Sequence, residues 1–402
     1  MAYGHRVPPA TASSRSVTLI VADGERLRGA IGPFEVETPW WQDTEPISRR
    51  FPDLAVLRII DVHAASGATS GGAVRYLVEQ LDPTSGTNLG RLEPPPSDVV
   101  LEEDPLRTPW ARPGGPRLDL EWVASIVPVT GRPMQRRTWN LSAIWSVPTA
   151  GGEVWLKCLP PFLGHEGQVL EALSDQAVPR LVGRDAHRLL LRSLPGRDGY
   201  DATLDERRQL IDTLITIQRA TVGRTSELLE RGVPDRRWPA LLSAGRAVVD
   251  ARLPEDLRLR ALLEDADART DAITACGMDD VLAHTDAHSG NARIVGGAEG
   301  PIWYDWGDSV VGHPMLDVAV LERPGTPFRD KLVSYWLDAW KLARPESDPH
   351  RAWPLVRPLA ALLGAVVYQR FLDGIERSER VYHEGDVVPC LERAAELAAA
   401  AV

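Results

Sequence analysis

The segments AHTDAHSGNA (residues 283–292) and YDWGD (residues 304–308) bring histidines, aspartates and an asparagine close together in the chain. Asp286 and Asn291 stand five positions apart. Phosphoryl transfer needs a carboxylate that orients the attacking hydroxyl, and it needs oxygen ligands for Mg²⁺. The two segments therefore predict a metal-assisted phosphoryl-transfer site. The alternatives are a histidine metal site and an ordinary polar loop.

The histidine alternative rests on the spacing of His284 and His288. They stand at i and i+4, which on a helix can mark a zinc site. Gly290 lies inside the segment, no glutamate occupies the required place, and the flanking residues favour strands. The pattern therefore favours Mg²⁺ over zinc.

The two segments together resemble the aminoglycoside phosphotransferase and choline kinase-like superfamily. The consensus sequences of this superfamily are close to HGDxHxxN and, further along, IDWGDxxxGDPxxDLA. The corresponding segments of this chain are HTDAHSGN and IWYDWGDSVVGHPMLD. The resemblance covers roughly residues 125–400. It implies an α+β, two-lobed, protein-kinase-like fold with a β-rich N-lobe and a helical C-lobe. It also implies Mg²⁺ as cofactor and ATP or GTP as co-substrate.

Site roles follow from the resemblance. Asp286 would be the catalytic base, and Asn291 and Asp305 would be the Mg²⁺ ligands. His284, His288 and Asp317 would support the site, with Asp317 steadying the catalytic segment as a buried carboxylate. Thr285 takes the place of the family's common glycine.

Lysine is rare in this chain. Of 45 basic residues only Lys157, Lys331 and Lys341 are lysines, which leaves 42 arginines. Lys157 ends the apolar strand pattern VWLK, and the resemblance makes it the lysine that contacts nucleotide phosphates. Glu166 would be its partner acid, with Glu171 as second choice.

Further nucleotide contacts are expected on both sides of this lysine. The backbone of Arg192, Ser193 and Leu194 would meet the base edge, and Trp155 would stack on the base or narrow the pocket. The segment TGRPMQRRTWN (residues 130–140) is expected to be the loop between the first two N-lobe strands. It is not a glycine-rich phosphate cradle, so its arginines 136 and 137 either contact phosphate or are solvated.

The chain divides into three predicted parts. Residues 1–115 form a β-rich N-terminal cap module of unknown role, with strands in SVTLIVADG, LAVLRIIDVHA and AVRYLVEQL and a helix in PWWQDTEPISRRF. Residues 116–197 form the N-lobe, and residues 198–402 form the helical C-lobe. In the C-lobe, Thr203 and Glu206 predict a capping box, and one helix is expected from about Pro254 to Gly277.

Composition restricts the class of protein. A length of 402 residues, 44% hydrophobic content and a net charge of −11 are typical of a folded protein without a basic nucleic-acid-binding face. No apolar run reaches the length of a membrane span, and the first residues lack a secretory apolar core. Three scattered cysteines indicate reduced thiols, and the cytoplasm is the expected compartment. The oligomeric state has no signature.

The acceptor is expected to be a hydroxylated small molecule. No APE phrase follows the DWG phrase, which argues against a protein substrate. Asp308, Asp373 and Glu376 are candidate acceptor ligands, and such acids would suit a cationic acceptor. Arginines 370, 377 and 380 interleave with the acids near residue 376, which favours a solvated helix as the alternative.

Three functions stay open. The first is an antibiotic kinase acting on an aminoglycoside, amino-sugar or nucleoside antibiotic, which would confer resistance or self-resistance on a GC-rich bacterium such as an actinomycete. The second is a metabolic sugar, amino-sugar or amino-alcohol kinase. The third is a non-catalytic nucleotide- or ligand-binding protein with the same fold. The presence of all four expected site residues, Lys157, Asp286, Asn291 and Asp305, argues against this third function.

Overall fold

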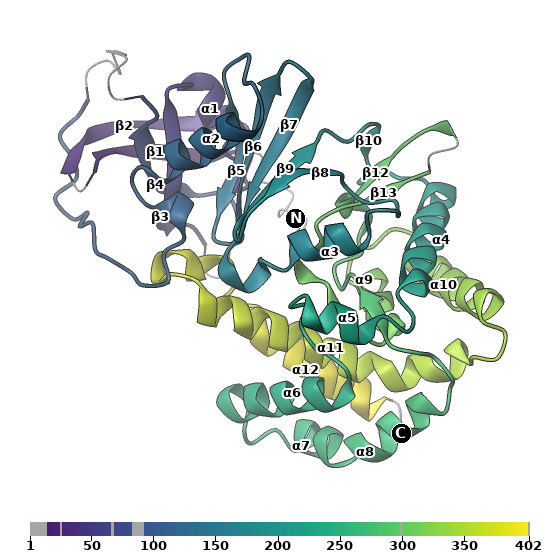
Figure 1. Ribbon diagram of the computed structural model, residues 1–402. Helices are drawn as coiled ribbons and strands as arrows, with labels where there is room; N and C mark the ends of the chain where they lie inside the picture. The colour runs from purple at the N-terminus through teal and green to yellow at the C-terminus, as the bar shows by residue number, and fades with distance from the viewer. Residues whose placement is uncertain (1–13, 25, 66–67, 83–91, 298–299, 401–402) are drawn as a thin grey trace.

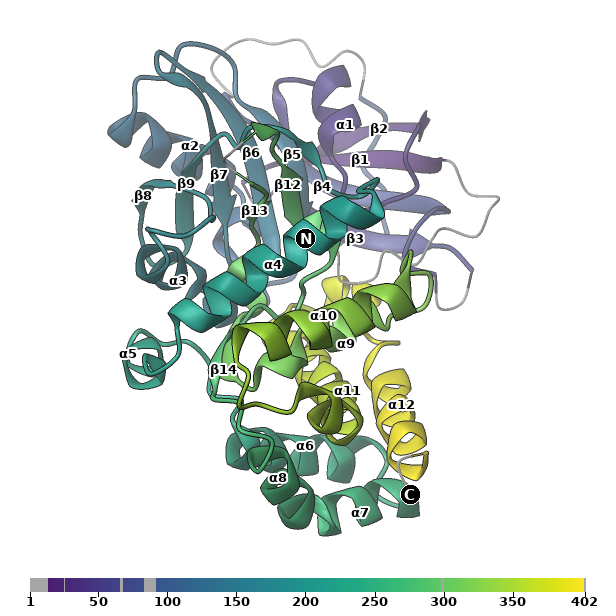
Figure 2. The same ribbon diagram turned by 90° about the vertical axis from the view of Figure 1, so that its right-hand side faces the viewer.

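The computed structural model describes residues 14–24, 26–65, 68–82, 92–297 and 300–400. A β-rich half stands above a helical half (Figure 1). This is the two-lobed α+β arrangement that the sequence predicted, with additional strands at the N-terminus. The same view turned by 90° shows helices α4 (Leu204–Ala220) and α10 (Arg329–Ala343) crossing the junction of the two halves (Figure 2).

The N-terminal module contains a four-stranded sheet in the order β2-β1-β4-β3. Its strands are β1 (Arg15–Asp23), β2 (Arg26–Val36), β3 (Leu54–His63) and β4 (Ala73–Gln80). Strands β1 and β4 are parallel, and the other neighbours are antiparallel. Strand β2 was not predicted, because Gly29, Gly32 and Pro33 interrupt its apolar pattern; an edge strand tolerates such residues. Helix α1 (Glu45–Arg50) is shorter than expected.

The N-lobe is a five-stranded antiparallel sheet in the order β5-β6-β7-β9-β8. Its strands are β5 (Met134–Trp139), β6 (Ser142–Thr149), β7 (Gly152–Cys158), β8 (Leu181–Arg184) and β9 (Arg188–Arg192). Strands β6 and β7 form a hairpin, with Thr149 opposite Gly152, and α3 (Glu166–Ala172) follows the third strand. The prediction of a loop over residues 130–140 was wrong, because most of that segment is β5.

Helix α2 (Gly115–Ile126) covers the back of this sheet and was not predicted. Its Val123 is packed in a buried cluster with Trp110, Trp145 and Leu156. The thiol of Cys158 on β7 donates to the buried carboxylate of Asp119 on α2 at 3.3 Å. The helix begins at the boundary proposed between the module and the N-lobe. The three-part division itself stays a prediction.

The C-lobe is helical, as predicted, and begins with the expected capping box at Thr203. One expected helix over residues 254–277 is instead two, with a break at Asp265, and α6 was not predicted. The remaining elements are α5 (Thr225–Glu230), α6 (Trp238–Arg252), α7 (Leu257–Glu264), α8 (Ala266–Thr274), α9 (Val318–Leu321), α11 (Pro349–Gly374) and α12 (Val387–Ala399).

Two small sheets lie beside these helices. One contains β10 (Arg197–Asp198), β12 (Ala292–Ile294) and β13 (Ile302–Trp303), and the other contains β11 (Val281–Ala283) and β14 (Val310–Gly312). They hold the segments around residues 286 and 305 in place. Helix α11 is long and apolar enough to cross a membrane by length and composition, but 61% of its most apolar window is buried inside the protein. It packs against α6, α8 and α12, as a core helix does.

The N-terminal module contacts the C-lobe as well as the N-lobe. The contact is made by the short 3-10 helix η7 (Arg377–Tyr382), which lies beneath β3 (Figure 1). We call this contact the η7 clasp. Its members are Glu376, Glu379 and Tyr382 from the C-lobe, Arg58, Ile59, Arg107 and Trp41 from the module, and Trp139 from β5.

Buried polar groups hold the clasp together. Glu376 Oε2 accepts from Arg107 Nε at 2.9 Å and lies 3.6 Å from Arg58 Nε. The amide of Ile59 donates to Glu379 Oε1 at 2.9 Å. The prediction that Glu376 lies on an acceptor pocket or a solvated helix was wrong, because Arg58 and Arg107 are its buried partners.

Aromatic rings complete the clasp. The Tyr382 ring lies 5.7 Å from Trp41 and 5.4 Å from Trp139, between ring centroids. All three side chains are at most 5% exposed. One ring of the C-lobe therefore packs against the module and against the end of the first N-lobe strand at the same time.

Stability should depend on pH through Glu379. Burial raises the pKa of this carboxyl to about 8, and the neighbouring Glu376 raises it further while the Ile59 amide opposes. The folded protein therefore keeps a proton that the unfolded chain releases above its ordinary pKa of 4.5. Below pH 4.5 the Glu379 carboxyl does not reduce the stability of the folded protein. Its destabilising effect grows as pH rises and reaches its full size above about pH 8.

The variant Glu379→Gln tests this dependence, because glutamine stays neutral and can still accept from the Ile59 amide. We expect the variant to become more stable relative to the unaltered protein as pH rises from 5 to 8. Melting temperatures of both proteins across this range measure the difference. Parallel curves would contradict the assignment.

Candidate active site

Lys157 joins the two lobes. It lies on β7 at the centre of the N-lobe sheet, where Ile144 and Leu189 are its neighbours on β6 and β9. Its Nζ donates to Glu166 Oε2 at 2.5 Å and to Asp305 Oδ1 at 2.7 Å, across 148 residues of sequence. The structure thus brings together three residues that the sequence singled out separately.

These three groups control one another's charge. Burial alone would raise the pKa of Asp305, but the Lys157 ammonium holds it below its ordinary value. Burial also raises the pKa of Glu166 above its ordinary value, with Lys157 opposing. Burial would lower the pKa of Lys157, but Asp305 and Glu166 more than offset that effect and raise it. An ionised Asp305 and a charged lysine are therefore the stable state.

Glu166 is the acid that pairs with this lysine, and Glu171 is not. The second oxygen of Glu166 accepts from the amide of Trp306 at 3.3 Å, so this side chain contacts both Lys157 and the segment after Asp305. Glu171 is bonded to Arg184 at the surface, at 2.7 Å. The order of preference in the sequence analysis agrees with this geometry.

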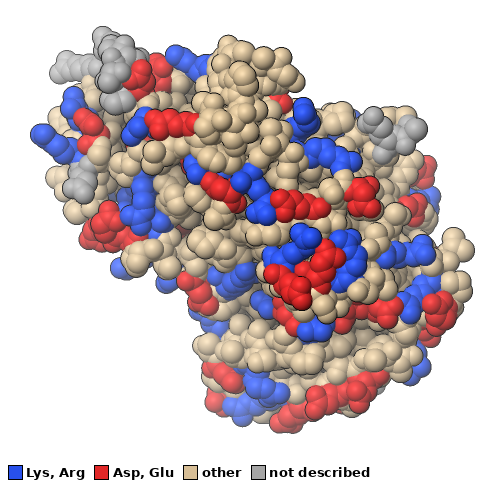
Figure 3. All heavy atoms as spheres, in the orientation of Figure 1, with Lys and Arg blue, Asp and Glu red and all other residues tan. Residues whose placement is uncertain are grey.

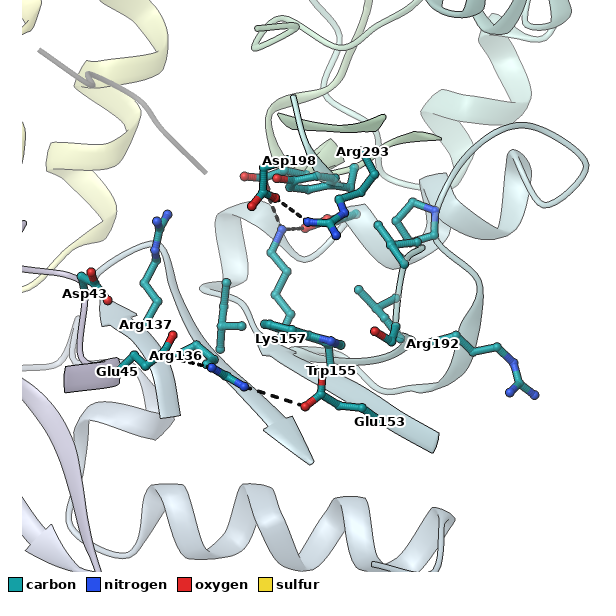
Figure 4. A pocket seen from close by; sticks show the side chains of 18 of the residues that line it. Asp43, Glu45, Arg136, Arg137, Glu153, Trp155, Lys157, Arg192, Asp198 and Arg293 are labelled. Carbon is teal, nitrogen blue, oxygen red and sulfur yellow. Dashed lines mark hydrogen bonds and ion pairs between the residues drawn. The ribbon is translucent and has the colours of Figure 1, made fainter. Parts of the chain in front are cut away.

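A cavity of about 580 Å³ opens in front of Lys157 (Figure 4). Six residues predicted to contact nucleotide line it, namely Trp155, Lys157, Glu166, Arg192, Ser193 and Leu194. The lining also contains residues that were not predicted, including Asp43, Glu45, Asp198, Tyr200, Arg293 and Tyr304. Asp43 and Glu45 come from the N-terminal module, which the sequence gave no reason to place beside the cleft.

Asp286 is almost completely buried in the segment of residues 283–292, at 1% exposure. Its Oδ2 accepts from Asn291 Nδ2 at 2.8 Å, and its Oδ1 accepts from Arg323 Nη1 at 2.7 Å. Burial raises the pKa of Asp286, while the Arg323 guanidinium opposes that rise. Asp286 and Asn291, which the sequence analysis paired by their spacing, are thus in direct contact.

Arg323 is a site residue that sequence reasoning missed. It follows α9 and comes six residues after Asp317, outside both motif segments. Its contact with Asp286 depends on how the chain turns after α9. The pattern of residues 283–308 therefore could not predict this contact. Its side chain is about one-third exposed, at 37%.

Asp317 supports the catalytic segment. It accepts from the amides of His284 at 3.1 Å and Thr285 at 2.5 Å, and from Gln218 Nε2 at 2.7 Å. Burial raises its pKa to about 6 although these donors oppose the rise. The carboxylate therefore ties the backbone just before Asp286 to the helical lobe.

The two histidines lie on either side of Asp286: its amide donates to His284 Nδ1 at 3.4 Å, and its Oδ2 lies 3.6 Å from His288 Nε2. His284 Nε2 lies 3.0 Å from the carbonyl of Tyr304, and its ring centroid lies 4.6 Å from that of Trp306. His288 Nδ1 accepts from the Gly290 amide at 3.0 Å. Both ring nitrogens of His284 have partners within the protein, so this histidine offers no nitrogen to a metal ion in this arrangement.

Thr285 has a left-handed backbone, with φ of 58°. A β-branched residue rarely adopts this conformation, which glycine accepts easily. The Thr285 hydroxyl donates to the carbonyl of Asp308 at 2.7 Å and so joins the catalytic segment to the YDWGD segment. Asp308 itself is half-buried, and burial together with the carboxylates of Asp286 and Asp305 raises its pKa.

Substitutions at Thr285 should separate backbone strain from this hydrogen bond. Thr285→Val keeps the branched shape and loses the hydroxyl, so we expect a loss of about 1–2 kcal/mol in the free energy of unfolding. Thr285→Ser keeps the hydroxyl and should remain within about 1 kcal/mol of the unaltered protein. Urea unfolding of both variants measures this. Equal stability of the two variants would show that the hydroxyl contributes nothing.

Two predicted acceptor residues lie away from this centre. Asp373 is exposed near the end of α11, where it accepts from Gln369 at 2.7 Å. Glu376 belongs to the η7 clasp, as described above. Of the three candidate acceptor ligands, only Asp308 has a pKa that is raised by the carboxylates of Asp286 and Asp305.

Comparison with known proteins decides the family. Residues 158–359 match the model of the phosphotransferase enzyme family, which is half of the chain. The chain belongs to the phosphotransferase enzyme family. The predicted resemblance to aminoglycoside phosphotransferases and choline kinases is confirmed, and so is the prediction of an enzyme of the small-molecule kinase type. A comparison with curated protein sequences finds no match.

Solved structures agree with the phosphotransferase fold. A choline kinase, LicA from Streptococcus pneumoniae, is similar with a TM-score of 0.52 and 14% identity, over 71% of this chain and 99% of that one. The GDP complex of aminoglycoside 2'-phosphotransferase-IIIa gives 0.50 and 14%, over 71% and 99%. A Plasmodium vivax ethanolamine kinase gives 0.50 and 12%, over 67% and 81%. At these identities the likeness confirms the protein-kinase-like fold alone.

Proposed function

We propose that this phosphotransferase moves the γ-phosphate of ATP or GTP to a hydroxyl of a small molecule, with Mg²⁺ as cofactor. The observation that carries the proposal is the contact of Lys157 with both Glu166 and Asp305. It joins the N-lobe sheet, α3 and the YDWGD segment at one cleft. A chain that had lost phosphoryl transfer would have no need to keep these three charges together.

The residues present fit a Mg²⁺ ion. Asn291 and Asp305 offer an amide oxygen and a carboxylate, and Mg²⁺ prefers oxygen ligands of this kind. The Asn291 nitrogen is directed at Asp286, which turns its amide oxygen away from that carboxylate. The low pKa of Asp305 keeps its carboxylate ionised, as a ligand must be. The bound ion would neutralise charge on the transferred phosphate.

Three side chains share the remaining work in this proposal. Lys157 supplies a compact positive charge for the phosphates of the nucleotide. Glu166 holds that lysine in the cleft. Asp286 orients the acceptor hydroxyl and accepts its proton, while Asn291 and Arg323 fix the position of its two oxygens. Arg323 also brings a positive charge to the Asp286 carboxylate.

The nucleoside part of the nucleotide would lie along the wall formed by Trp155 and residues 192–194. Trp155 and Lys157 are two residues apart on β7 and so face the same side of the sheet. The amides of Arg192 and Ser193 donate to the carbonyls of Arg180 and Glu153, at 3.0 and 3.3 Å. These bonds hold the end of β9 beside the cavity.

For the acceptor we propose an antibiotic of aminoglycoside, amino-sugar or nucleoside type, so that phosphorylation would confer resistance. One similar structure is an aminoglycoside 2'-phosphotransferase, which supports this choice. A metabolic amino-alcohol or sugar kinase is the second candidate, because other similar structures are choline and ethanolamine kinases. A cytoplasmic location would supply the nucleoside triphosphate and suits free cysteines at 158, 276 and 390.

The decisive experiment incubates the purified protein with ATP or GTP, Mg²⁺ and a panel of aminoglycosides, amino sugars, nucleosides and amino alcohols. Mass spectrometry should find one acceptor class that gains a single phosphate. Nucleotide binding without transfer to any acceptor would favour the non-catalytic alternative. Absence of both binding and transfer would overturn the proposed function.

A further inference from the structure

We propose that Glu45, in the N-terminal module, is a positioning residue of the nucleotide site, because it fixes Arg136 against Trp155. The proposal rests on the proposed function, in which Trp155 faces the nucleoside. It gives the module a role that its own sequence does not reveal. Figure 4 shows Arg136 between Glu45 and Glu153, beside Trp155.

Backbone pairing carries Glu45 to the cleft. The chain just before α1 runs beside β5: the amide of Thr138 donates to the carbonyl of Gln42 at 3.0 Å, and the amide of Thr44 donates to the carbonyl of Arg136 at 3.3 Å. Glu45 is the next residue and the first of α1. Its position beside Arg136 is therefore fixed by the main chain and does not depend on a flexible side chain alone.

The Arg136 guanidinium is held by acceptors on several sides. Its Nη1 lies 2.7 Å from Glu45 Oε1, its Nε donates to Ser146 Oγ at 2.9 Å, and its Nη2 lies 3.8 Å from Glu153 Oε1. Ser146 is buried, with 2% exposure. A planar guanidinium held at three of its nitrogens has one orientation. Glu45 supplies the shortest of these contacts.

Arg136 in turn lies over the Trp155 indole, with its Cζ 5.6 Å from the ring centroid. This is a cation–π contact, which is strongest for tryptophan. Trp155, Arg136, Glu45 and Lys157 all line the same cavity. An indole held in one orientation presents a prepared surface to a nucleoside, and such preparation lowers the cost of binding.

The pair should affect binding more than it affects stability. The side chains of Glu45 and Arg136 are 28% and 25% exposed, and partly solvated ion pairs contribute little to folding. Positively and negatively charged residues are interspersed over the visible face of the molecule (Figure 3). The Glu45–Arg136 pair lies against an indole, Trp155, that lines the cavity in front of Lys157.

The chain offers a matched control. Glu45 also bonds Arg49, one helical turn further along α1, on an exposed surface. Glu45→Gln weakens both contacts of the carboxylate, whereas Arg49→Gln removes only the surface contact and leaves Arg136 paired. A comparison of the two variants therefore isolates the contact in the cleft.

The experiment measures the dissociation constant of Mg·ATP and Mg·GTP by calorimetry, and KM and kcat where an acceptor is known. Glu45→Gln should raise the dissociation constant and KM of the nucleotide about threefold to tenfold, with kcat changed less than twofold. Arg49→Gln should change neither. Arg136→Gln should raise the dissociation constant at least as much, because it also removes the contact with Trp155. The double variant should add nothing beyond Arg136→Gln, because Glu45 acts through Arg136.

Three results would overturn the proposal. One is an unchanged nucleotide dissociation constant in Glu45→Gln. Another is an equal effect in Arg49→Gln. The third is a lower melting temperature in Glu45→Gln while nucleotide affinity stays intact, which would leave a purely structural contact. Failure of the unaltered protein to bind any nucleotide is a different result, because it would refute the proposed function itself.

Discussion

Replacement of Asp286 by asparagine should lower kcat by about 10²–10⁴-fold, the usual contribution of a positioned general base. The amide cannot accept the proton of the acceptor hydroxyl. Asparagine has nearly the same shape as aspartate, so the contacts of residue 286 with Asn291 and Arg323 change in charge and little in volume. Phosphate transfer to the best acceptor, followed by mass spectrometry, gives the rate.

Nucleotide affinity separates this effect from loss of structure. Lys157, Trp155 and the cavity lining are unchanged in Asp286→Asn, so the dissociation constant of Mg·ATP should stay within about threefold of that of the unaltered protein. Asp373→Asn is a matched control, because it makes the same chemical change at an exposed position of α11. A fully active Asp286→Asn variant would remove this residue from the mechanism.

The second large effect should be on stability. Glu376→Gln leaves the buried guanidinium groups of Arg58 and Arg107 without their carboxylate, and loss of one partner of a buried ion pair costs about 3–5 kcal/mol. Burial already lowers the pKa of Arg58, which shows how poorly solvated this group is. We expect a clearly lower urea midpoint and melting temperature.

The same measurement on Asp373→Asn should show a change of no more than about 0.5 kcal/mol, since Asp373 is exposed. This comparison matters because residues 373 and 376 looked alike in the sequence, as acids among arginines. Equal stability of the two variants would mean that the η7 clasp contributes nothing to folding.

The core of the site could be predicted because its signals are local. The strand pattern before Lys157 places its side chain on one face of a sheet, and the spacing of Asp286 and Asn291 lies within a single loop. Neither signal says that the two segments meet. That step came from resemblance to a family, and the contact between Lys157 and Asp305 agrees with it.

Other features were hidden because they depend on distant parts of the chain. Strand β5 reads as a polar loop, since its Arg136 faces Glu45, an acid that the sequence cannot place there. Arg323 reaches Asp286 only because of the turn after α9. Glu376 appears solvated from its charged neighbours, yet Arg58 and Arg107, contributed from more than half the chain away, bury it.

The η7 clasp changes what can be expected of this enzyme when it is dissected or when it moves. The lobes are linked by the chain between β9 and α4, and they are linked a second time through Tyr382, Trp41 and Trp139. Because the N-lobe and the C-lobe are linked at two places, we expect them not to open by rotation about a single hinge. Apolar residues of the first sheet, among them Val17 and Tyr76, belong to one continuous buried cluster with those of the C-lobe. A fragment that begins at residue 116 would therefore expose apolar surface on both lobes. We expect residues 1–115 and the two lobes to unfold together, in one cooperative transition.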